Sequence, residues 1–209
     1  MKKPKVRIKR VVLAIIAMVI IVASVYYLVV NFTGKEKTEK ATEVINEIKE
    51  YGYTLNDNET KLYNDLFKSL KDTLEADKVN EEDYASLISE LFVADFYNLD
   101  NKLTNNDIGG IQFVETDAQA NFILKAQDTI YKYVKSNMDG DRDQDLPKIK
   151  SIEVNGVYDK EFTYGSNTDK NAYEIKLIWE YEEDLGYETS ATLIVVHETE
   201  KKLAIVELN

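Results

Sequence analysis

Near its amino terminus the chain has twenty consecutive residues without a charge, VVLAIIAMVIIVASVYYLVV, from Val11 to Val30. At about 1.5 Å of rise per residue, a helix of this length reaches about 30 Å, the thickness of the hydrocarbon core of a bilayer. The run therefore predicts a transmembrane helix over residues 11–31. The lipid bilayer is the first partner that the sequence indicates.

The residues around this run indicate its orientation and argue against cleavage. The first ten residues, MKKPKVRIKR, carry six positive charges and no acid, and such clusters stay on the cytoplasmic side. A cleaved signal peptide has an apolar region of about 7–15 residues that ends in a small-x-small site, whereas this run is longer and contains VASVYY. We expect a single-pass protein of the cell membrane, with residues 1–10 as a cytoplasmic tail and the remainder outside the cytoplasm.

The composition describes a folded but strongly acidic remainder. Hydrophobic residues make up 44% and charged residues 31% of the chain, which is typical of a globular domain. The net charge of -12 includes the six positive charges of residues 1–10, so the rest carries -18. Such a domain repels phosphate, which disfavours nucleic acid as a partner. The absence of cysteine excludes disulfides and thiolate chemistry.

Residues 32–56 are expected to form a juxtamembrane helix or stalk. From Thr38 to Glu50, apolar residues recur three and four positions apart and form one stripe, which predicts a helix that Gly52 interrupts. The stripe consists of Ala41, Val44, Ile45 and Ile48. The sequence leaves open whether this helix packs on the domain or stands away from it.

Residues 57–209 are expected to form an extracytoplasmic α+β domain with three helices. The first runs from about Glu59 to Glu75, and the second follows Asn80, a good N-cap, and ends near Leu99. The third runs from Thr116 to about Ser136, because Thr116 and Gln119 match a capping box. The segment IQFV, before this third helix, is interpreted as a short strand.

Beyond Pro147 the periodicity of the sequence changes from helical to alternating. The segment AYEIKLIWEYEE is the clearest strand, with apolar and charged residues in turn. DLGYE and TEKK are expected to be turns into TSATLIVVHE and LAIVEL. The last third is therefore predicted to be an antiparallel sheet of four strands, or five with IQFV, that packs one face on the helices.

This order of elements resembles the NTF2-like superfamily. The resemblance lies in ISELFVADFYNLDNKLTNNDIGGIQFVETDAQANFILKAQDTIYKYV and in the strands that follow, over about residues 57–209. It implies a curved sheet that wraps around helices to form a cone. The anchor followed by a domain is similar to the layout of VirB8-like and TcpC-like conjugation proteins. The superfamily contains enzymes as well as binding domains, so the resemblance does not select a function.

The stretch NMDGDRDQDLP raises the possibility of a calcium loop, with acids at every second position. These are Asp139, Asp141, Asp143 and Asp145. An EF-hand loop that begins at Asp139 requires glycine at its sixth position and glutamate at its twelfth, but these positions hold Gln144 and Lys150. We expect a solvated acidic connection, with weak calcium binding as the alternative and no other metal or cofactor.

The sequence offers little for catalysis. The chain has one histidine, His197, near the end of a predicted strand, where a proton-transfer role requires a neighbouring carboxylate. No nucleophile elbow, phosphate loop or HExxH motif is present. We therefore expect a protein that is not an enzyme.

Two hypotheses for function follow. The first is an interaction module that presents an NTF2-like domain to other envelope proteins. The resemblance implies that such a domain can form a homodimer through its outer sheet face, which carries Glu174, Lys176, Ile178 and Glu180. The second is a domain that binds a small ligand or peptide in the cone. Its expected pocket residues are Phe92, Phe96, Tyr133, Trp179, Tyr181 and His197. A large apolar cavity favours the second hypothesis, and a filled cone favours the first.

Overall fold

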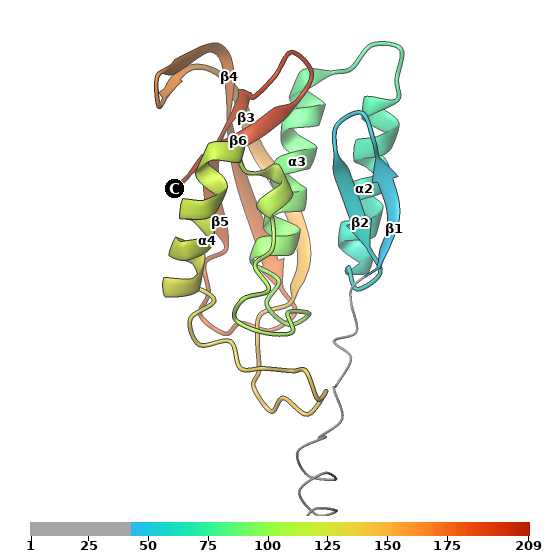
Figure 1. Ribbon diagram of the computed structural model, residues 1–209, viewed down its shortest axis with the longest axis vertical. Helices are drawn as coiled ribbons and strands as arrows, with labels where there is room; N and C mark the ends of the chain where they lie inside the picture. Colours follow the sequence, from blue (N-terminus) through green and yellow to red (C-terminus); the bar gives the residue numbers. More distant parts are fainter. Residues whose placement is uncertain (1–42) are drawn as a thin grey trace, which may run out of the picture. The chain divides into compact units, whose positions relative to one another are not determined.

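The structure, a computed structural model, describes residues 43–209, whose main feature is a four-stranded antiparallel sheet (Figure 1). The strand order is β3-β4-β5-β6. The strands are β3 (Ile149–Tyr164), β4 (Asn167–Tyr181), β5 (Ser190–His197) and β6 (Leu203–Leu208). This strand order confirms the predicted four-stranded antiparallel sheet. Alternation along β4 puts Ile175, Leu177 and Trp179 on a buried face.

Two of the predicted helices form where their capping residues indicate. Helix α2 (Lys61–Leu74) begins after Thr60, whose side chain accepts a hydrogen bond from the Tyr63 N–H. Helix α3 (Glu81–Phe96) begins after Asn80, with acidic residues in its first turn. Ten of the sixteen residues of α3 are buried, because α3 lies between the sheet and α2 (Figure 1).

The predicted helix from Thr38 to Glu50 is wrong over its described part. Residues there form a hairpin of β1 (Val44–Ile48) and β2 (Tyr53–Asn56). Gly52 makes the turn with a φ of 71°, a conformation that glycine adopts without strain. The domain therefore begins before residue 57, and the compact unit extends from Thr42 to Asn209.

Side-chain hydrogen bonds explain why this segment is a hairpin and not a helix. The Tyr53 hydroxyl lies 2.7 Å from the Tyr84 hydroxyl and donates to the Leu203 carbonyl at 3.1 Å. The Gln112 side chain accepts from the Thr54 N–H at 2.9 Å and donates to the Thr54 carbonyl at 3.1 Å, as a neighbouring strand would. These partners are distant in sequence, so local periodicity does not reveal them.

The segment between α3 and β3 also differs from the expectation. IQFV is not a strand: Ile111–Phe113 is the 3-10 helix η1, and only Val114 forms a bridge, parallel to Ile205. Thr116–Ala118 is a second 3-10 helix, η2, whose N-cap is Glu115.

The third predicted helix is shorter than expected, because α4 covers only Gln119–Asp128. The expected capping box does not form. The hydroxyl and N–H of Thr116 both donate to the Glu198 carboxylate instead. Glu115 caps this turn locally, because its carboxylate accepts the Ala118 N–H at 3.0 Å, and the distant Glu198 binds Thr116.

Within residues 43–209, none of the helices combines the length and apolar character that crossing a bilayer requires. The predicted cytoplasmic tail (1–10), membrane span (11–31) and first part of the stalk lie outside the described residues.

The turn at Gly110 gives a test of the core. Gly110 has a φ of 76°, and a Cβ there would lie 2.7 Å from the Phe92 ring, whereas Gly52 has a similar φ with no atom within 4 Å of a Cβ. We expect Gly110→Ala to destabilise the domain by about 3 kcal/mol or more, and Gly52→Ala by about 1–2 kcal/mol. Urea denaturation of residues 42–209 measures both, and equal losses would contradict this packing.

Candidate functional site

A pocket of about 980 Å³ lies among α3, α4, β6 and the loop that joins β4 to β5. Figure 1 shows how these elements are arranged. Its volume is in the upper range of sites for small ligands. Helix α4 and strand β6 each contribute four lining residues, and the loop adds Gly186–Glu188. The pocket shows that the space between helices and sheet is not filled in this part of the domain.

Three phenylalanines form the apolar wall of the pocket. Phe92 and Phe96 lie one turn apart on α3, with ring centroids 5.2 Å apart. Phe122, from α4, lies 5.7 Å from the Phe92 ring and 5.1 Å from the Phe96 ring. Tilted rings at these distances attract each other and hold a rigid surface. Phe92 is 0% and Phe96 5% exposed, so Phe122 is the ring of the three that offers accessible surface to an apolar ligand group.

Helix α4 leaves the pocket open because little of its surface is buried in the core. Only Ala126 among its residues is fully buried. Phe122 faces the pocket and is partly buried, whereas Leu124 is 61% exposed. A helix that buries so little of its surface forms a side wall and does not fill the cavity.

The opposite wall is the edge strand β6, of which the consecutive residues 205–209 all line the pocket. Side chains of a strand alternate between faces. Five successive lining residues therefore mean that the pocket follows the strand's edge and not one of its faces.

Polar side chains form a substantial part of the pocket lining, namely Asn121, Lys125, Thr129, Glu188, Glu207 and Asn209. Lys125 on α4 is its basic residue, and Glu188 and Glu207 are its acids. Glu188 accepts a hydrogen bond from the Tyr97 hydroxyl at 3.4 Å, and burial raises the pKa of Tyr97 above its ordinary value. The rim is thus net acidic, and so is the whole domain. The chain carries -12 in total and residues 1–42 carry +7, so residues 43–209 carry -19.

The structure brings two of the six expected pocket residues into this pocket, Phe92 and Phe96. Trp179 is 4% exposed and packs in the core against Tyr97, with ring centroids 4.7 Å apart. Tyr181 lies nearby and donates its hydroxyl proton to the Glu188 carbonyl at 2.9 Å. Tyr133, expected on a helical stripe, lies beyond α4 and is 75% exposed.

Sequence reasoning missed much of the pocket. Phe122 lies within the predicted helix from Thr116 to Ser136 but was not expected in the pocket, and Lys125 was not singled out. The available signals were Phe96, one helical turn after Phe92, and Phe122, an aromatic residue in the next predicted helix. The contribution of β6 is visible only once the strand order is known.

His197 does lie beside carboxylates, but outside this pocket. Its Nδ1 is 2.8 Å from the Asp169 carboxylate, which also accepts the His197 N–H at 2.7 Å. Its Nε2 is 3.5 Å from Glu81, whose carboxylate accepts the Tyr173 hydroxyl at 3.2 Å. These bonds join the start of β4 and the end of β5 to the start of α3.

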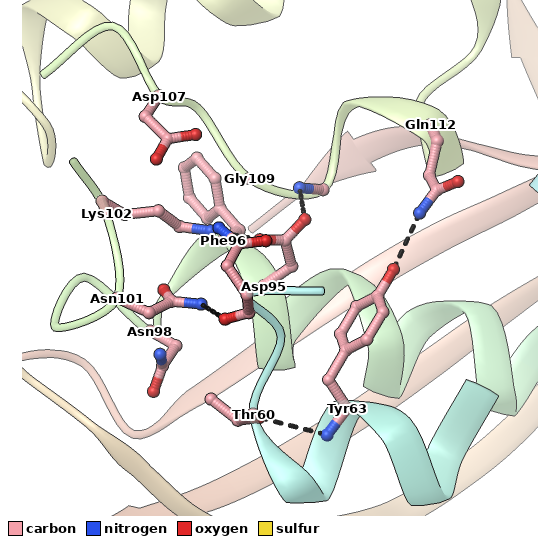
Figure 2. Close-up of polar contacts among 12 residues, drawn as sticks. Thr60, Tyr63, Asp95, Phe96, Asn98, Asn101, Lys102, Asp107, Gly109 and Gln112 are labelled. Carbon is pink, nitrogen blue, oxygen red and sulfur yellow. Dashed lines mark hydrogen bonds and ion pairs between the residues drawn. The ribbon is translucent and has the colours of Figure 1, made fainter. Parts of the chain in front are cut away.

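A buried ion pair closes the other end of α3. Figure 2 shows the Lys102 ammonium group at the Asp95 carboxylate, with Asn98, Asn101 and Asp107 around the pair. Asp95 also accepts the Gly110 N–H at 2.7 Å. Removing one partner of such a pair leaves an uncompensated buried charge, which costs about 3–5 kcal/mol. The pair thus fixes the loop that carries Lys102 against the end of α3.

Glu59 lies close to this pair, and among the described residues one oxygen of its carboxyl group lacks a hydrogen bond. Its Oε2 is buried and has no hydrogen-bond partner within residues 43–209. Burial, together with the negative charge of Asp95, raises the pKa of Glu59 to about 7. Burial also raises the pKa of Glu90, on α3, to about 7.

The acidic connection, residues 137–147, is held in place by hydrogen bonds from Arg142. The Arg142 guanidinium donates to the carbonyls of Lys102 at 2.7 Å and Asp100 at 2.5 Å. Asp143 pairs with Lys135 at 3.1 Å. In the described part of the chain, no three acidic or histidine side chains are arranged to hold a metal ion. Arg142 therefore packs the connection on the loop that follows α3.

The outer sheet face, expected as a dimer surface, pairs its charges internally. Lys160 and Lys176 both contact Glu174, at 2.6 and 3.6 Å, and Lys150 contacts Glu180 at 3.0 Å. Ile178 is 39% exposed among them. Dimerisation through this face stays a prediction.

No protein-family model, no curated protein and no solved structure matches this chain. The function is therefore inferred from the geometry of the domain.

The two buried glutamates predict a pH dependence. Between their ordinary pKa of 4.5 and their folded pKa of about 7, the folded state binds more protons than the unfolded state. Stability is therefore expected to fall as pH rises from about 5 to 8. The full shift corresponds to about 3 kcal/mol for each group, which partial exposure reduces to about 1 kcal/mol.

Melting temperatures of wild type and Glu59→Gln/Glu90→Gln between pH 5 and 8 measure this effect. We expect the melting temperature of the double variant to fall much less over this pH range than that of wild type. The double variant should be the more stable protein at pH 8. A Glu82→Gln change, on the exposed first turn of α3, is the control. A decrease of the same size in all three proteins would contradict the assignment.

Proposed function

We propose that this chain is a membrane-anchored binding protein whose extracytoplasmic domain takes an apolar group of a partner into the pocket beside β6. The aromatic wall of Phe92, Phe96 and Phe122 around an open volume of about 980 Å³ carries this proposal. A few polar groups at the rim of an apolar pocket give orientation and specificity. The proposal joins interaction with envelope proteins to binding in a pocket.

Binding without catalysis agrees best with the lining of the pocket. Its ionisable side chains, Lys125, Glu188 and Glu207, stand at the exposed rim. His197 and its two carboxylates lie elsewhere and bond to one another. General acid–base chemistry requires such groups within hydrogen-bond reach of a bound substrate.

The finer fold that we propose is the NTF2-like cone. Its support is the crossing of α3 over an antiparallel sheet, with a pocket between helices and sheet. Placement in the cell membrane is supported by the uncharged run Val11–Val30 and the basic residues before it.

Protease accessibility tests the orientation. The full chain, with one epitope tag before residue 1 and another after residue 209, is expressed in a bacterium whose cell wall is then removed. Added protease is expected to remove the carboxy-terminal tag from intact cells and to reach the amino-terminal tag only after lysis. Protection of both tags before lysis would contradict an external domain.

Binding of a small aromatic probe tests the pocket. The full chain is placed in lipid nanodiscs, with empty nanodiscs as the blank, and the ¹⁹F resonance of N-acetyl-4-fluorophenylalanine methylamide is recorded. We expect line broadening with wild type and with Leu124→Trp, on the exposed side of α4. Asn121→Trp should remove the broadening, because Asn121 lines the pocket and a large ring would fill it.

Leu124→Trp is the matched control for Asn121→Trp. Leu124→Trp adds the same ring to the same helix outside the pocket. Equal broadening by Asn121→Trp and wild type would place the probe elsewhere and overturn the pocket as the binding site. Melting curves confirm that both variants are folded.

A further inference from the structure

We propose that the ligand of this pocket is an extended segment of a partner protein, which adds as a strand to the open edge of β6. This inference rests on the proposed function and specifies its ligand class. The edge of β6, the aromatic wall and the charge of the rim each support it.

The main-chain groups on the outer edge of β6 are satisfied at one end of the strand. The Leu203 N–H donates to the Tyr84 hydroxyl at 3.2 Å, and the Leu203 carbonyl accepts from Tyr53. The Ile205 carbonyl accepts the Glu115 N–H at 3.0 Å, beside the parallel bridge between Val114 and Ile205. Side chains and one passing segment thus cover this half of the edge.

The other half of the edge lies in the pocket. Asn209 exchanges both main-chain hydrogen bonds with Thr192 on β5, at 2.7 and 2.9 Å. Main-chain groups in an antiparallel strand point alternately to either side. The N–H and carbonyl of Leu208 therefore point away from β5, toward the space that Leu208 lines. An extended peptide in the pocket meets this pair of groups first.

The parallel bridge at Ile205 shows that this edge accepts a strand partner. Among residues 43–209 one bridge forms there, because Glu115 begins the turn into η2 and leads away from the sheet. A peptide that begins where this contact ends extends the same edge toward Leu208. Addition of a strand to an exposed edge is a recurring mode of peptide recognition.

The aromatic wall fits the side chains of such a strand. In an extended peptide every second side chain points to the same face. These side chains would meet Phe122 and Phe96 across the pocket from β6. Main-chain hydrogen bonds give affinity in this mode, and pockets for alternate side chains give specificity.

The charge of the site selects a basic segment. Glu188 and Glu207 stand at the rim against the single Lys125, and residues 43–209 carry -19. Opposite charge on a partner accelerates its encounter with such a surface. The segment that fits alternates large apolar residues with small ones and carries lysine or arginine at its ends.

Backbone methylation of a defined peptide tests this mode. The probe is a fluorescein-labelled peptide, Lys-Thr-Phe-Thr-Val-Thr-Phe-Lys, with two analogues that are N-methylated at alternate residues in opposite phase. Fluorescence anisotropy measures their binding to the full chain in nanodiscs. We expect at least about a tenfold loss of affinity for one analogue and about twofold or less for the other, because one phase donates to β6.

A pair of variants at one position gives an independent readout. Leu208→Pro removes the outward N–H, whereas Leu208→Ala keeps it and shortens the same side chain. An edge strand tolerates proline where the N–H points outward, and melting curves check this. We expect Leu208→Pro to bind the unmethylated peptide at least about tenfold more weakly than Leu208→Ala.

The outcomes separate this inference from the proposed function. Equal binding by both methylated analogues, with loss in Asn121→Trp, would overturn strand addition and leave the pocket. Binding that Asn121→Trp does not reduce would overturn both. No binding of the peptide, together with self-association of the full chain in detergent that Leu208→Pro abolishes, would overturn the partner peptide in favour of a second copy.

Discussion

The burial of α3 is the constraint on which the rest of the domain depends. Ten of its sixteen residues are buried, because the sheet covers one side and α2 the other. A helix in this position must satisfy polar groups at both ends within the protein. At the start the Asn80 side chain accepts the Glu82 N–H, and at the end the Tyr131 hydroxyl donates to the Phe96 carbonyl at 2.8 Å.

The same helix determines where the pocket lies. Phe92 and Phe96 face away from α2 toward α4, and α4 buries only Ala126 fully, so the space between them stays open. The Gly110 turn packs directly on the Phe92 ring and keeps the wall in place. The aromatic wall is therefore rigid where it meets a ligand, which lowers the entropic cost of binding.

The sequence predicted the elements whose signals are local. Strong alternation in β4, helical periodicity up to Glu75 and the N-cap Asn80 sufficed for the sheet and two helices. The hairpin of β1 and β2 was mistaken for a helix because Val44 and Ile45 fit a helical stripe. These two side chains are 57% and 58% exposed, so the stripe had no core to face. Glu198 likewise binds Thr116, where a capping box was expected.

The uncharged run with its basic flank, the antiparallel strands and the net acidity can be read from the sequence, because each is a property of neighbouring residues or of composition. The hairpin, the pocket and the half-open edge of β6 arise from the packing of distant segments. These depend on contacts such as Tyr53 with Leu203, which join positions 150 residues apart. Periodicity within one segment carries no information about which distant group will satisfy a main-chain hydrogen bond.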